Sequence, residues 1–351
     1  MSRAHPYVEL PAHQFWRRSV AGVDRHAFDP VVAPRFRIDA QSAVATAGSC
    51  FAQHISRKLQ SLGFNYLQCE AGAGLDAEAR RAGQYGLFSA RYGNLYTARQ
   101  LLQLFHRAYG RFEPAEPAWQ RPDGRWADPF RPSIEAAGFE SPEAMLSDRA
   151  SHLAAVRGVF ERADLFVFTL GLTEGWRSKA DGAMFPLAPG VVAGEHDASR
   201  HEFVNFGVQE TEQDLAEFIG LLKGVNPRAK VLLTVSPVPL AATYESRHVL
   251  VATTYSKSVL RVAAESAWRR FDWVDYFPSY EIITGSYNEG AYYEADHREV
   301  NALGVAHAMR CFSGHYLEGG SLAAASVFVP PSSGDGSSLV CDEEALDQVR
   351  G

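Results

Sequence analysis

Apolar runs of strand length alternate with amphipathic helical segments along most of this chain. The first run, AVATA (43–47), is followed by Gly48 and then by the segment FAQHISRKLQSLGF (51–64). The apolar residues of that segment recur at helical spacing: Phe51, Ile55, Leu59 and Leu62. Gly63 then supplies a typical helix stop. The pattern predicts a strand, a tight turn and a helix.

The same alternation returns in the second half of the chain. A helical pattern at 141–163 opens with Ser141 and Pro142, which suit an N-cap and the first helical position. It leads into DLFVFTLGLTEGW (164–176), an apolar run that suits a strand buried on both faces. The later segments predict, in order, a helix near 211–224, a strand at 229–240, a helix around 247–270, a short strand at FDWVDY and a helix from about 299 to 313.

Helices that separate apolar strands indicate βαβ units, and these build a parallel sheet with helices on both faces. We expect one doubly wound α/β domain over residues 41–317, with ligands beyond the carboxyl ends of its strands. Residues 1–40 are aromatic and irregular, which predicts an arm packed on this domain. The Gly/Ser/Pro-rich stretch 318–351 predicts a peripheral or flexible tail. Two aperiodic stretches, 110–140 and 177–206, are candidate lids or binding loops because they are long for connections.

Composition excludes several classes of protein. The 351 residues are 46% hydrophobic and 21% charged, with a net charge of −7 and no Lys/Arg-rich block, so nucleic acid is not an expected partner. No run of 18 apolar residues and no apolar leader core occurs, so we expect a cytoplasmic protein without a membrane partner. The four cysteines, Cys50, Cys69, Cys311 and Cys341, form no CxxC pair, so we expect at least some of them to be free thiols. The sequence gives no oligomeric state.

The turn Gly48-Ser49-Cys50 is the first candidate for chemistry. A thiol at the start of a helix feels the positive end of the helix dipole, which favours the thiolate, and backbone N–H groups of such a turn can hold an oxyanion. Taken alone, the turn is equally typical of a structural role. Cys50 is then a small buried hydrophobe and Ser49 a helix N-cap.

Two more polar groups follow predicted strands or precede helices. In ARYGNLYT (90–97), Gly93 and Asn94 are candidates to face an anionic intermediate with a backbone N–H and an amide. Thr173 and Glu174 end the most hydrophobic strand. Two residues of the first motif are candidates for a substrate wall, or else for packed loop positions: Arg91 and Tyr92.

The loop YYEADHREVNALG supplies a histidine before the last predicted helix. His297 has Glu294 three residues earlier and Asp296 next to it, and a carboxylate beside a histidine can set its tautomer and stabilise its cation. A metal site formed by Cys50, His54 and His297 is an alternative, and His196 with His201 is another. No HExxH or paired-Cys spacing supports either, so we expect no metal.

These motifs, taken together and in order, resemble the GSCFA-domain proteins, a group related to the SGNH (GDSL-like) hydrolases. The residues that carry the resemblance are GSCFA, SARYGNLYTARQL, TLGLTEGW, SPVPL, DYFPSYEI and YYEADHREVNALG, spread over roughly residues 5 to 315. The resemblance implies a flavodoxin-like, three-layer α/β/α sandwich. Its sheet is doubly wound and mainly parallel, with five strands.

The resemblance also implies roles for individual residues. Aligned by its glycine, the first SGNH block places Cys50 where the family has its nucleophilic serine. The second block places Gly93 as an oxyanion donor. The third places Thr173 at the oxyanion asparagine and Glu174 at the aspartate that follows. The last block, Asp-x-x-His, becomes Glu294-x-x-His297 here.

Three departures from the SGNH pattern bear on the activity. A cysteine nucleophile favours a thioester intermediate, which suits acyl transfer as much as hydrolysis. Threonine in place of asparagine weakens the oxyanion hole unless Asn94 replaces it. Glu294 is one methylene longer than aspartate, so Asp296 competes with it as the partner of His297.

The expected function is therefore that of an acyl hydrolase or acyltransferase, without a cofactor. It would act on a small-molecule or carbohydrate-linked acyl substrate. Two alternatives remain open at this point. One is an esterase that uses Ser49, and the other is a binding or assembly module that keeps the fold without the chemistry.

Overall fold

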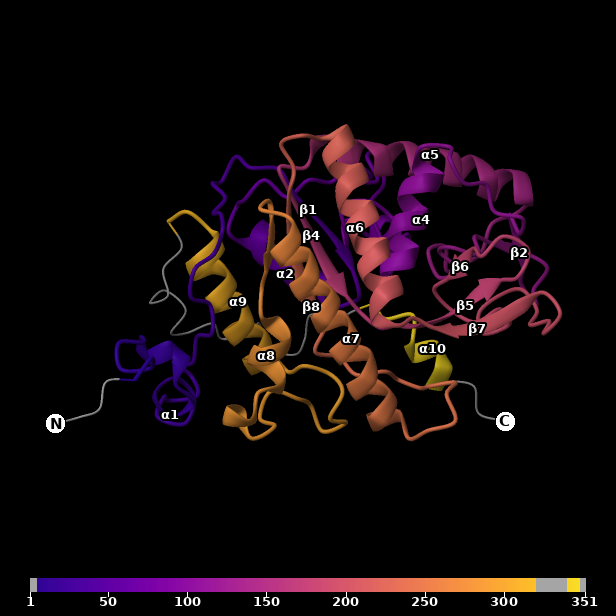
Figure 1. Ribbon diagram of the computed structural model, residues 1–351. Coiled ribbons are helices and arrows are strands. Elements are labelled where there is room, and N and C mark those ends of the chain that lie inside the picture. Colours follow the sequence, from indigo (N-terminus) through magenta and orange to yellow (C-terminus); the bar gives the residue numbers. More distant parts are fainter. Residues whose placement is uncertain (1–4, 320–339, 348–351) are drawn as a thin grey trace.

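The computed structural model describes residues 5–319 and 340–347 (Figure 1). At its centre lies a parallel sheet in the order β1 (Val44–Gly48), β4 (Leu165–Leu170), β8 (Lys230–Val235) and β9 (Val274–Tyr276). All residues of β1 and β4 are buried. The predicted parallel α/β sheet is thus confirmed, and its central strands are apolar because both faces are covered.

The described part of the chain has four strands in this sheet instead of the five expected, and a single bridge extends its edge beside β1. Tyr66 forms an isolated parallel bridge with Val44, on the edge of β1 away from β4. The Leu67 amide donates to the Val44 carbonyl over 2.8 Å, and then the Cys69 amide bonds to Ser89 instead. The chain therefore changes direction across the sheet after β1, which makes the carboxyl ends of β1 and β4 a topological switch point.

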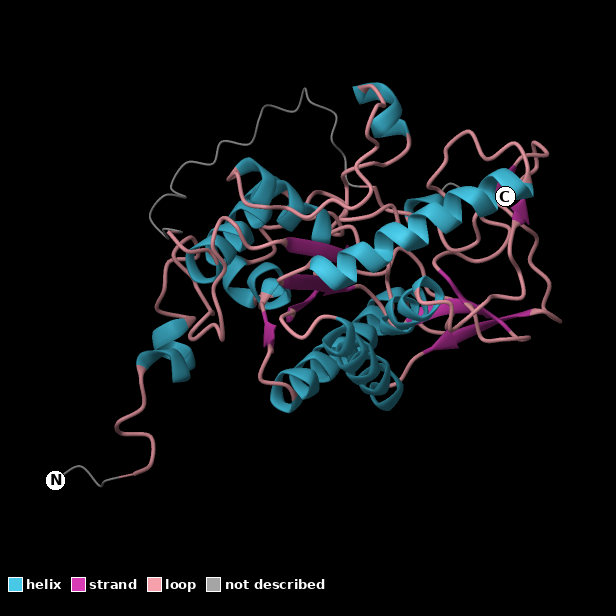
Figure 2. Ribbon diagram, turned by 90° about the horizontal axis from the view of Figure 1, so that it is seen from above, coloured by secondary structure: helices cyan, strands magenta, loops and turns pink. Residues whose placement is uncertain are grey.

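Helices cover both faces of the sheet (Figures 1 and 2). One face packs against α4 (Ala98–Ala108), α5 (Pro142–Arg162), α6 (Val208–Val225) and α7 (Val249–Arg270). The other packs against α2 (Ala52–Ser61), α8 (Ser279–Thr284) and α9 (Ala302–Tyr316). Strand β4 serves both cores, since Phe166 and Phe168 point to the first and Leu165 and Val167 to the second.

The apolar run 164–176, predicted as one strand, is divided in the structure. Strand β4 ends at Leu170, and the amides of Gly171 and Leu172 bond to the Tyr96 carbonyl over 3.0 and 3.1 Å instead of continuing the ladder. The chain then enters β5 (Glu174–Ser178), which belongs to a separate antiparallel sheet. Apolar character predicted the strand correctly but did not reveal this turn.

The two aperiodic stretches fold into a small region with its own core. Strand β5 lies between β6 (Met184–Phe185) and β7 (His201–Asn205), and β2 (Trp119–Gln120) pairs with β3 (Trp126–Ala127). The side chains of Trp119, Phe130 and Phe185 pack together. These stretches are therefore ordered structure over the domain. The remaining elements are η1 (Ala12–Gln14), α1 (Trp16–Ser19), α3 (Ala77–Ala82), η2 (Ser286–Asn288) and α10 (Glu344–Asp347).

Both ends of the described chain have residues buried against the domain. Near the start, Phe28 and Ile38 are buried, and Ile38 bridges to Leu317 just after α9. Residues 320–339 of the expected peripheral tail lie outside the described residues. Beyond them, Asp342 and Glu343 are each 8% exposed, so this part of the tail is buried and not peripheral.

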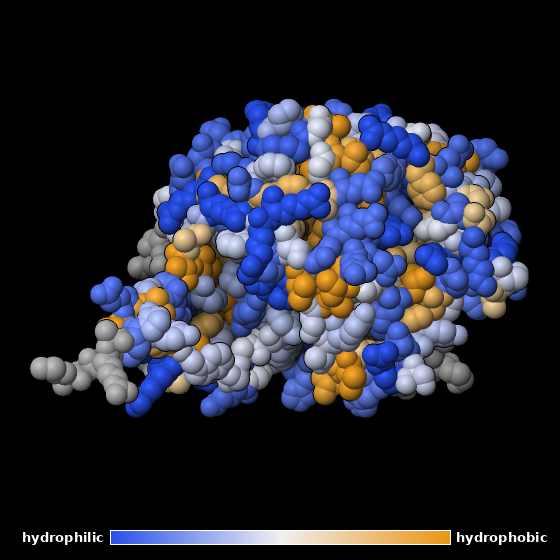
Figure 3. Space-filling model, in the orientation of Figure 1, coloured by the Kyte–Doolittle hydropathy of each residue, from blue (hydrophilic) through white to orange (hydrophobic). Residues whose placement is uncertain are grey.

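The molecular surface over α6 and α7 is mixed, with apolar side chains scattered among polar ones (Figure 3). Several of the exposed apolar residues lie on or just before α7: Tyr244, Leu250, Val251, Tyr255 and Val262. Among the helices that the structure describes, none is both long and apolar enough to cross a membrane.

Candidate functional site

Gly48 fixes the turn that presents Ser49 and Cys50 at the carboxyl end of the sheet. Its φ is +127°, and a Cβ built there would lie 2.3 Å from the Thr169 carbonyl oxygen, so no other residue fits without displacing backbone. The Ser49 amide bonds to that carbonyl over 3.1 Å, and the Leu95 amide bonds to the Gly48 carbonyl over 2.9 Å. The turn is thereby held between β4 and the segment that contains Gly93.

Two backbone amides at this turn are available to a ligand. Within the described residues, the N–H groups of Cys50 and Gly93 donate no hydrogen bond. Gly93 has a φ of +67°, and nothing lies within 4 Å of a Cβ built on it. Two free amides beside a buried thiol are what an oxyanion hole requires. The structure thus places Cys50 and Gly93 at one end of the sheet, as the sequence pattern predicted.

Ser49 does not cap the helix that follows. Helix α2 has Phe51 at its N-cap position and no side-chain cap bond, and the buried Ser49 hydroxyl has no partner among the described residues. The N-cap expectation was wrong because the turn between Gly48 and α2 is tight. The first amides bond to carbonyls three residues back, as in Ala52 to Ser49 and Gln53 to Cys50.

The C-terminal segment 340–343 lies in this site. The Gln53 side chain pairs with the Val340 backbone, donating to its carbonyl over 3.0 Å and accepting from its amide over 3.3 Å. The Asn94 amide nitrogen donates to the Val340 carbonyl over 3.1 Å and to the Asp342 carboxylate over 3.0 Å. Asn94 therefore contacts the segment 340–343, and its side-chain amide is bonded to the protein's own chain.

Cys341 brings a second thiol to Cys50. The side-chain interaction with Cys341, followed by burial, raises the pKa of Cys50 well above its ordinary value. The same contact is the largest cause that lowers the pKa of Cys341. The Arg298 guanidinium also favours a thiolate there, with Nη2 lying 3.9 Å from the Cys341 Sγ. The position of Cys50 at the start of α2 therefore does not lower its pKa while Cys341 lies beside it, and Cys341 is the more acidic of the two thiols.

Two cations act electrostatically on Glu343, and one of them, Arg298, contacts it. Arg298 Nη2 lies 3.3 Å from Glu343 Oε2. Lys257, 2% exposed, donates from Nζ to the Gly171 carbonyl over 2.6 Å. Burial lowers the pKa of Lys257 to about 8, although the charge of Glu343 acts in the opposite direction. Burial in turn raises the pKa of Glu343, against the effect of both cations.

The sequence reasoning missed Lys257, although α7 carries a signal. The buried residues of that helix recur at helical spacing, as in Ala252, Leu260 and Ala267, and Ser256 and Lys257 interrupt the stripe with polar groups. A polar side chain in such a stripe must find a buried partner. The Ser256 hydroxyl accepts from the Thr173 amide over 3.0 Å, and Lys257 reaches the site.

The histidine loop reaches the site with Arg298 and not with His297. His297 is exposed at a φ of +56°, and its ring forms no hydrogen bond with another described residue. Glu294 and Asp296 are exposed as well. Asp296 accepts from the Arg298 and Glu299 amides over 2.9 and 3.0 Å and so holds the turn. The predicted pairing of His297 with Cys50 is therefore not assembled in this structure.

Thr173 and Glu174 support the neighbouring loops. The Thr173 hydroxyl donates to Asn205 Oδ1 over 2.6 Å, so neither its hydroxyl nor its amide is free for an oxyanion. Glu174 accepts from the Thr243 hydroxyl over 2.7 Å and the Tyr244 amide over 3.3 Å. Burial raises the pKa of Glu174 in spite of these bonds. These contacts brace β5 and do not lead to Cys50.

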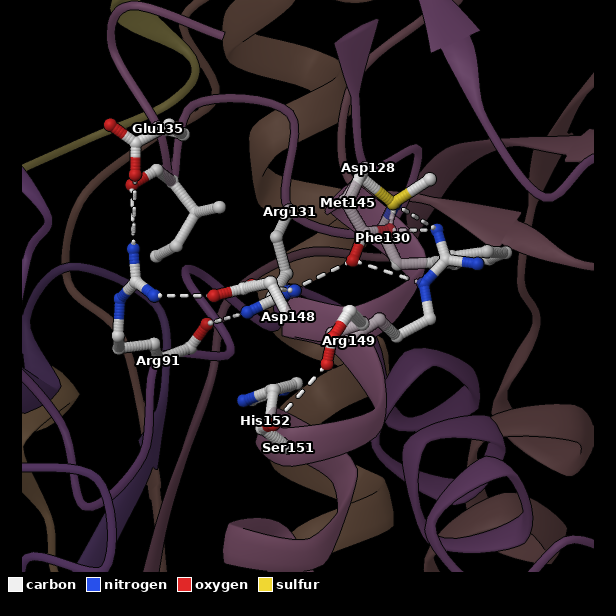
Figure 4. A network of polar contacts seen from close by, with 12 residues as sticks. Arg91, Asp128, Phe130, Arg131, Glu135, Met145, Asp148, Arg149, Ser151 and His152 are labelled. Atoms are coloured by element: carbon white, nitrogen blue, oxygen red, sulfur yellow. Dashed lines mark hydrogen bonds and ion pairs between the residues drawn. The ribbon is translucent and has the colours of Figure 1, made fainter. Parts of the chain in front are cut away.

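Arg91 and Tyr92 anchor the chain before Gly93 and do not form a substrate wall. Arg91, 3% exposed, donates to the Gly83 carbonyl over 2.7 Å and pairs with Asp148 at 3.1 Å (Figure 4). The Tyr92 hydroxyl donates to the Thr46 carbonyl in β1. These buried hydrogen bonds and ion pairs agree with the alternative that Arg91 and Tyr92 are loop residues packed on the domain.

The stretch 110–140 is fixed by a buried ionic network (Figure 4). Asp128, fully buried, pairs with Arg131 at 2.9 Å and with Arg149 of α5 at 2.6 Å. Burial alone would raise the pKa of Asp128, but the charges of Arg131, Arg149 and Arg107 outweigh it and hold that pKa far below its ordinary value. This bonding gives the stretch a rigid connection to the domain.

The histidines considered as metal ligands have other surroundings. His54 is packed edge-on against Phe51, and burial, followed by the charge of Arg57, lowers its pKa to about 3. His201 bonds to Glu116 over 2.8 Å, and His196 packs against Trp176. In residues 5–319 and 340–347 no three His, Cys, Asp or Glu side chains gather in a metal-binding arrangement.

The fold and the site define a doubly wound α/β protein with a buried thiol at the switch point of its sheet. The GSCFA family model matches residues 43–312, and the chain belongs to the GSCFA family. No curated protein and no solved structure gives a significant match. The family match includes Cys50, Lys257 and Arg298 and leaves out residues 340–347.

Proposed function

We propose that the protein is an SGNH-like acyl hydrolase or acyltransferase that uses Cys50 as its nucleophile. The observation that carries this proposal is the position of the Cys50 thiol at the end of β1, beside the free amides of Cys50 and Gly93. The ordered sequence motifs support an SGNH-like three-layer sandwich, in which the bridge at Tyr66 takes the place of a fifth strand.

In the proposed reaction, the Cys50 sulfur attacks the acyl carbonyl carbon and a sulfur–carbon bond forms. The carbonyl oxygen becomes an oxyanion between the Cys50 and Gly93 amides, with the Asn94 side chain beside them. Collapse of this intermediate breaks the bond to the alcohol or amine, which leaves with the proton that the base took from the Cys50 thiol. Water or an acceptor hydroxyl then attacks the thioester and restores the thiol.

His297 is the proposed base, with Glu294 or Asp296 as its partner. This role requires the His297 ring to turn toward Cys50 once residues 340–343 leave the site. The ring is one residue from Arg298, whose side chain already reaches Cys341 and Glu343. Loss of these two contacts would free the loop for this movement.

The test is turnover of p-nitrophenyl acetate together with mass spectrometry of the acyl adduct. We expect an acetyl group on the peptide that contains Cys50, and loss of both adduct and turnover in Cys50→Ala. If Cys50→Ala retains full turnover and Ser49→Ala loses it, the Ser49 esterase is correct instead. The unpartnered, buried Ser49 hydroxyl is the observation in favour of that alternative.

The third possibility is a binding or assembly module. The observation in its favour is that the site is occupied by the protein's own segment 340–343. A range of esters and thioesters that yields no adduct on either Cys50 or Ser49 would support it over both enzymes.

A further inference from the structure

We propose that Lys257 and Arg298 form a carboxylate-binding subsite beside Cys50, which Glu343 fills in the structure. The substrate is then an acyl compound that carries a free carboxylate. This inference rests on the proposed function, since it names the substrate class of the same site.

The first argument is geometric. Lys257 comes from α7 and Arg298 from the loop before α9. Arg298 is paired with the Glu343 carboxylate, and the charge of Lys257 acts on the same carboxylate. Arg298 Nη2 lies 3.3 Å from that carboxylate, which is 8% exposed. The charge of Arg298 lowers the pKa of Cys50, and the charge of Cys50 raises the pKa of Lys257. The subsite therefore lies near the proposed nucleophile.

The second argument is charge balance. Among the described residues, Lys257 has no ion pair within 4 Å, and Glu343 is the carboxylate paired with Arg298. Removal of Glu343 from the site would leave Arg298 without its ion-pair partner and the buried Lys257 without the nearby charge that favours its ammonium form, which is costly in a protein interior. A ligand that replaces Glu343 must therefore supply a negative charge.

The third argument concerns what else the site holds. Gln53 bonds both the backbone N–H and the backbone C=O of Val340, and Asn94 donates to the same carbonyl. Val340 and Glu343 are three residues apart, a span of at most about 10 Å. The segment therefore resembles a short ligand with an amide or ester carbonyl at one end and a carboxylate at the other.

The fourth argument is that the cations belong to the family domain and the segment does not. Gln53, Asn94, Lys257 and Arg298 lie within the matched region 43–312, while residues 340–343 lie beyond it. The binding groups are thus part of the domain itself. The C-terminal segment uses them as an internal competitor for substrate.

The experiment measures alkylation of Cys50 by iodoacetamide, a neutral reagent, in the full-length chain. The readout is the modified fraction of the tryptic peptide 38–57 over time. We expect Glu343→Gln to increase the rate at least fivefold, and the exposed Glu318→Gln to leave it unchanged as a matched control. Glutarate should return the rate of Glu343→Gln toward that of the wild type, whereas its neutral diamide should not.

The variants Lys257→Met and Arg298→Met, each combined with Glu343→Gln, should lose protection by glutarate. The proposal would be overturned if glutarate and its diamide protected Cys50 from alkylation equally, or if neither protected it. Protection by inorganic phosphate equal to that by glutarate would overturn its specificity for carboxylates. Because alkylation is measured without turnover, failure of Cys50 as a nucleophile would leave this result unaffected.

Discussion

Two buried polar clusters in this molecule differ in where their counterions come from. Around Asp128, the paired arginines Arg131 and Arg149 and the carboxylate all belong to residues 128–149. Around Cys50, the cations Lys257 and Arg298 are balanced by Glu343, which comes from a separate C-terminal segment. The first arrangement suits a structural support, and the second suits a site that exchanges its occupant.

The largest expected effect separates chemistry from stability at the Cys50 cluster. Cys50→Ala should reduce turnover at least about a thousandfold, because loss of the nucleophile removes the covalent pathway. Its thermal midpoint should stay close to that of the wild type, since a thiol is replaced by a smaller apolar group. Ester turnover and differential scanning calorimetry on the same preparation check this, with Cys69→Ala as the control. An inactive variant that is also strongly destabilised would not support a catalytic role.

The Asp128 cluster should show the opposite behaviour. Asp128→Asn should lower the free energy of unfolding by about 3–5 kcal/mol, because it leaves buried arginines without their counterion. The exposed Asp123→Asn, in the same stretch, is the control and should change little. Urea unfolding at pH 7 measures both.

The pH dependence of that stability follows from the depressed pKa of Asp128 in the folded state. The carboxylate contributes its full stabilisation above the unfolded pKa of about 4, and the contribution is lost as the pH falls toward the folded value. Asp128→Asn should therefore flatten the acid limb of the stability curve. An unchanged acid limb would show that other carboxylates control it.

The next effect concerns the reactivity of the Cys50 thiol. Cys341→Ala removes the largest cause of the raised pKa of Cys50, so the alkylation profile of Cys50 should move to lower pH. One pKa unit corresponds to about a tenfold higher thiolate fraction, and hence rate, at pH 8. Cys69→Ala should leave the profile in place. If the Cys341→Ala profile coincides with that of the wild type, the two thiols do not interact.

The smallest effect is expected at Glu174, which the resemblance placed at the SGNH aspartate position. Glu174→Gln keeps an acceptor for the Thr243 hydroxyl. It removes a buried carboxyl group whose pKa is already raised by burial. We expect a change in unfolding free energy of no more than about 1 kcal/mol, and unchanged turnover. A hundredfold loss of turnover would show that Glu174 has a role in the active site.

Much of the fold was predictable because local patterns and the architecture agree. The apolar runs that became β1, β4 and β8 were predicted from the pattern of apolar positions, and Ser141 with Pro142 correctly marked the start of α5. Gly48 was placed between a strand and a helix from the sequence alone. Its close contact with the Thr169 carbonyl came only from the structure, since it depends on the packing of β1 against β4.

The site was predictable in part. Cys50 was predicted at the site because it follows a strand end, and Gly93 and Asn94 because their motif precedes a helix. Arg91, Thr173 and Glu174 are near in sequence to site residues, but their side chains are used in buried bonds elsewhere. Sequence spacing gives the position of a residue along a strand, but not which neighbour its side chain bonds.

The sequence by itself determined the order of strands and helices, the parallel sheet and the edge at which Cys50 lies, because these follow from local hydrophobic periodicity and chain connectivity. Only the tertiary structure decided what Cys50 meets there. It brought Cys341 and Glu343 to the site, turned Arg298 inward and left His297 exposed. Such contacts join segments far apart in the chain, and they are set by burial and charge balance, which no local pattern records.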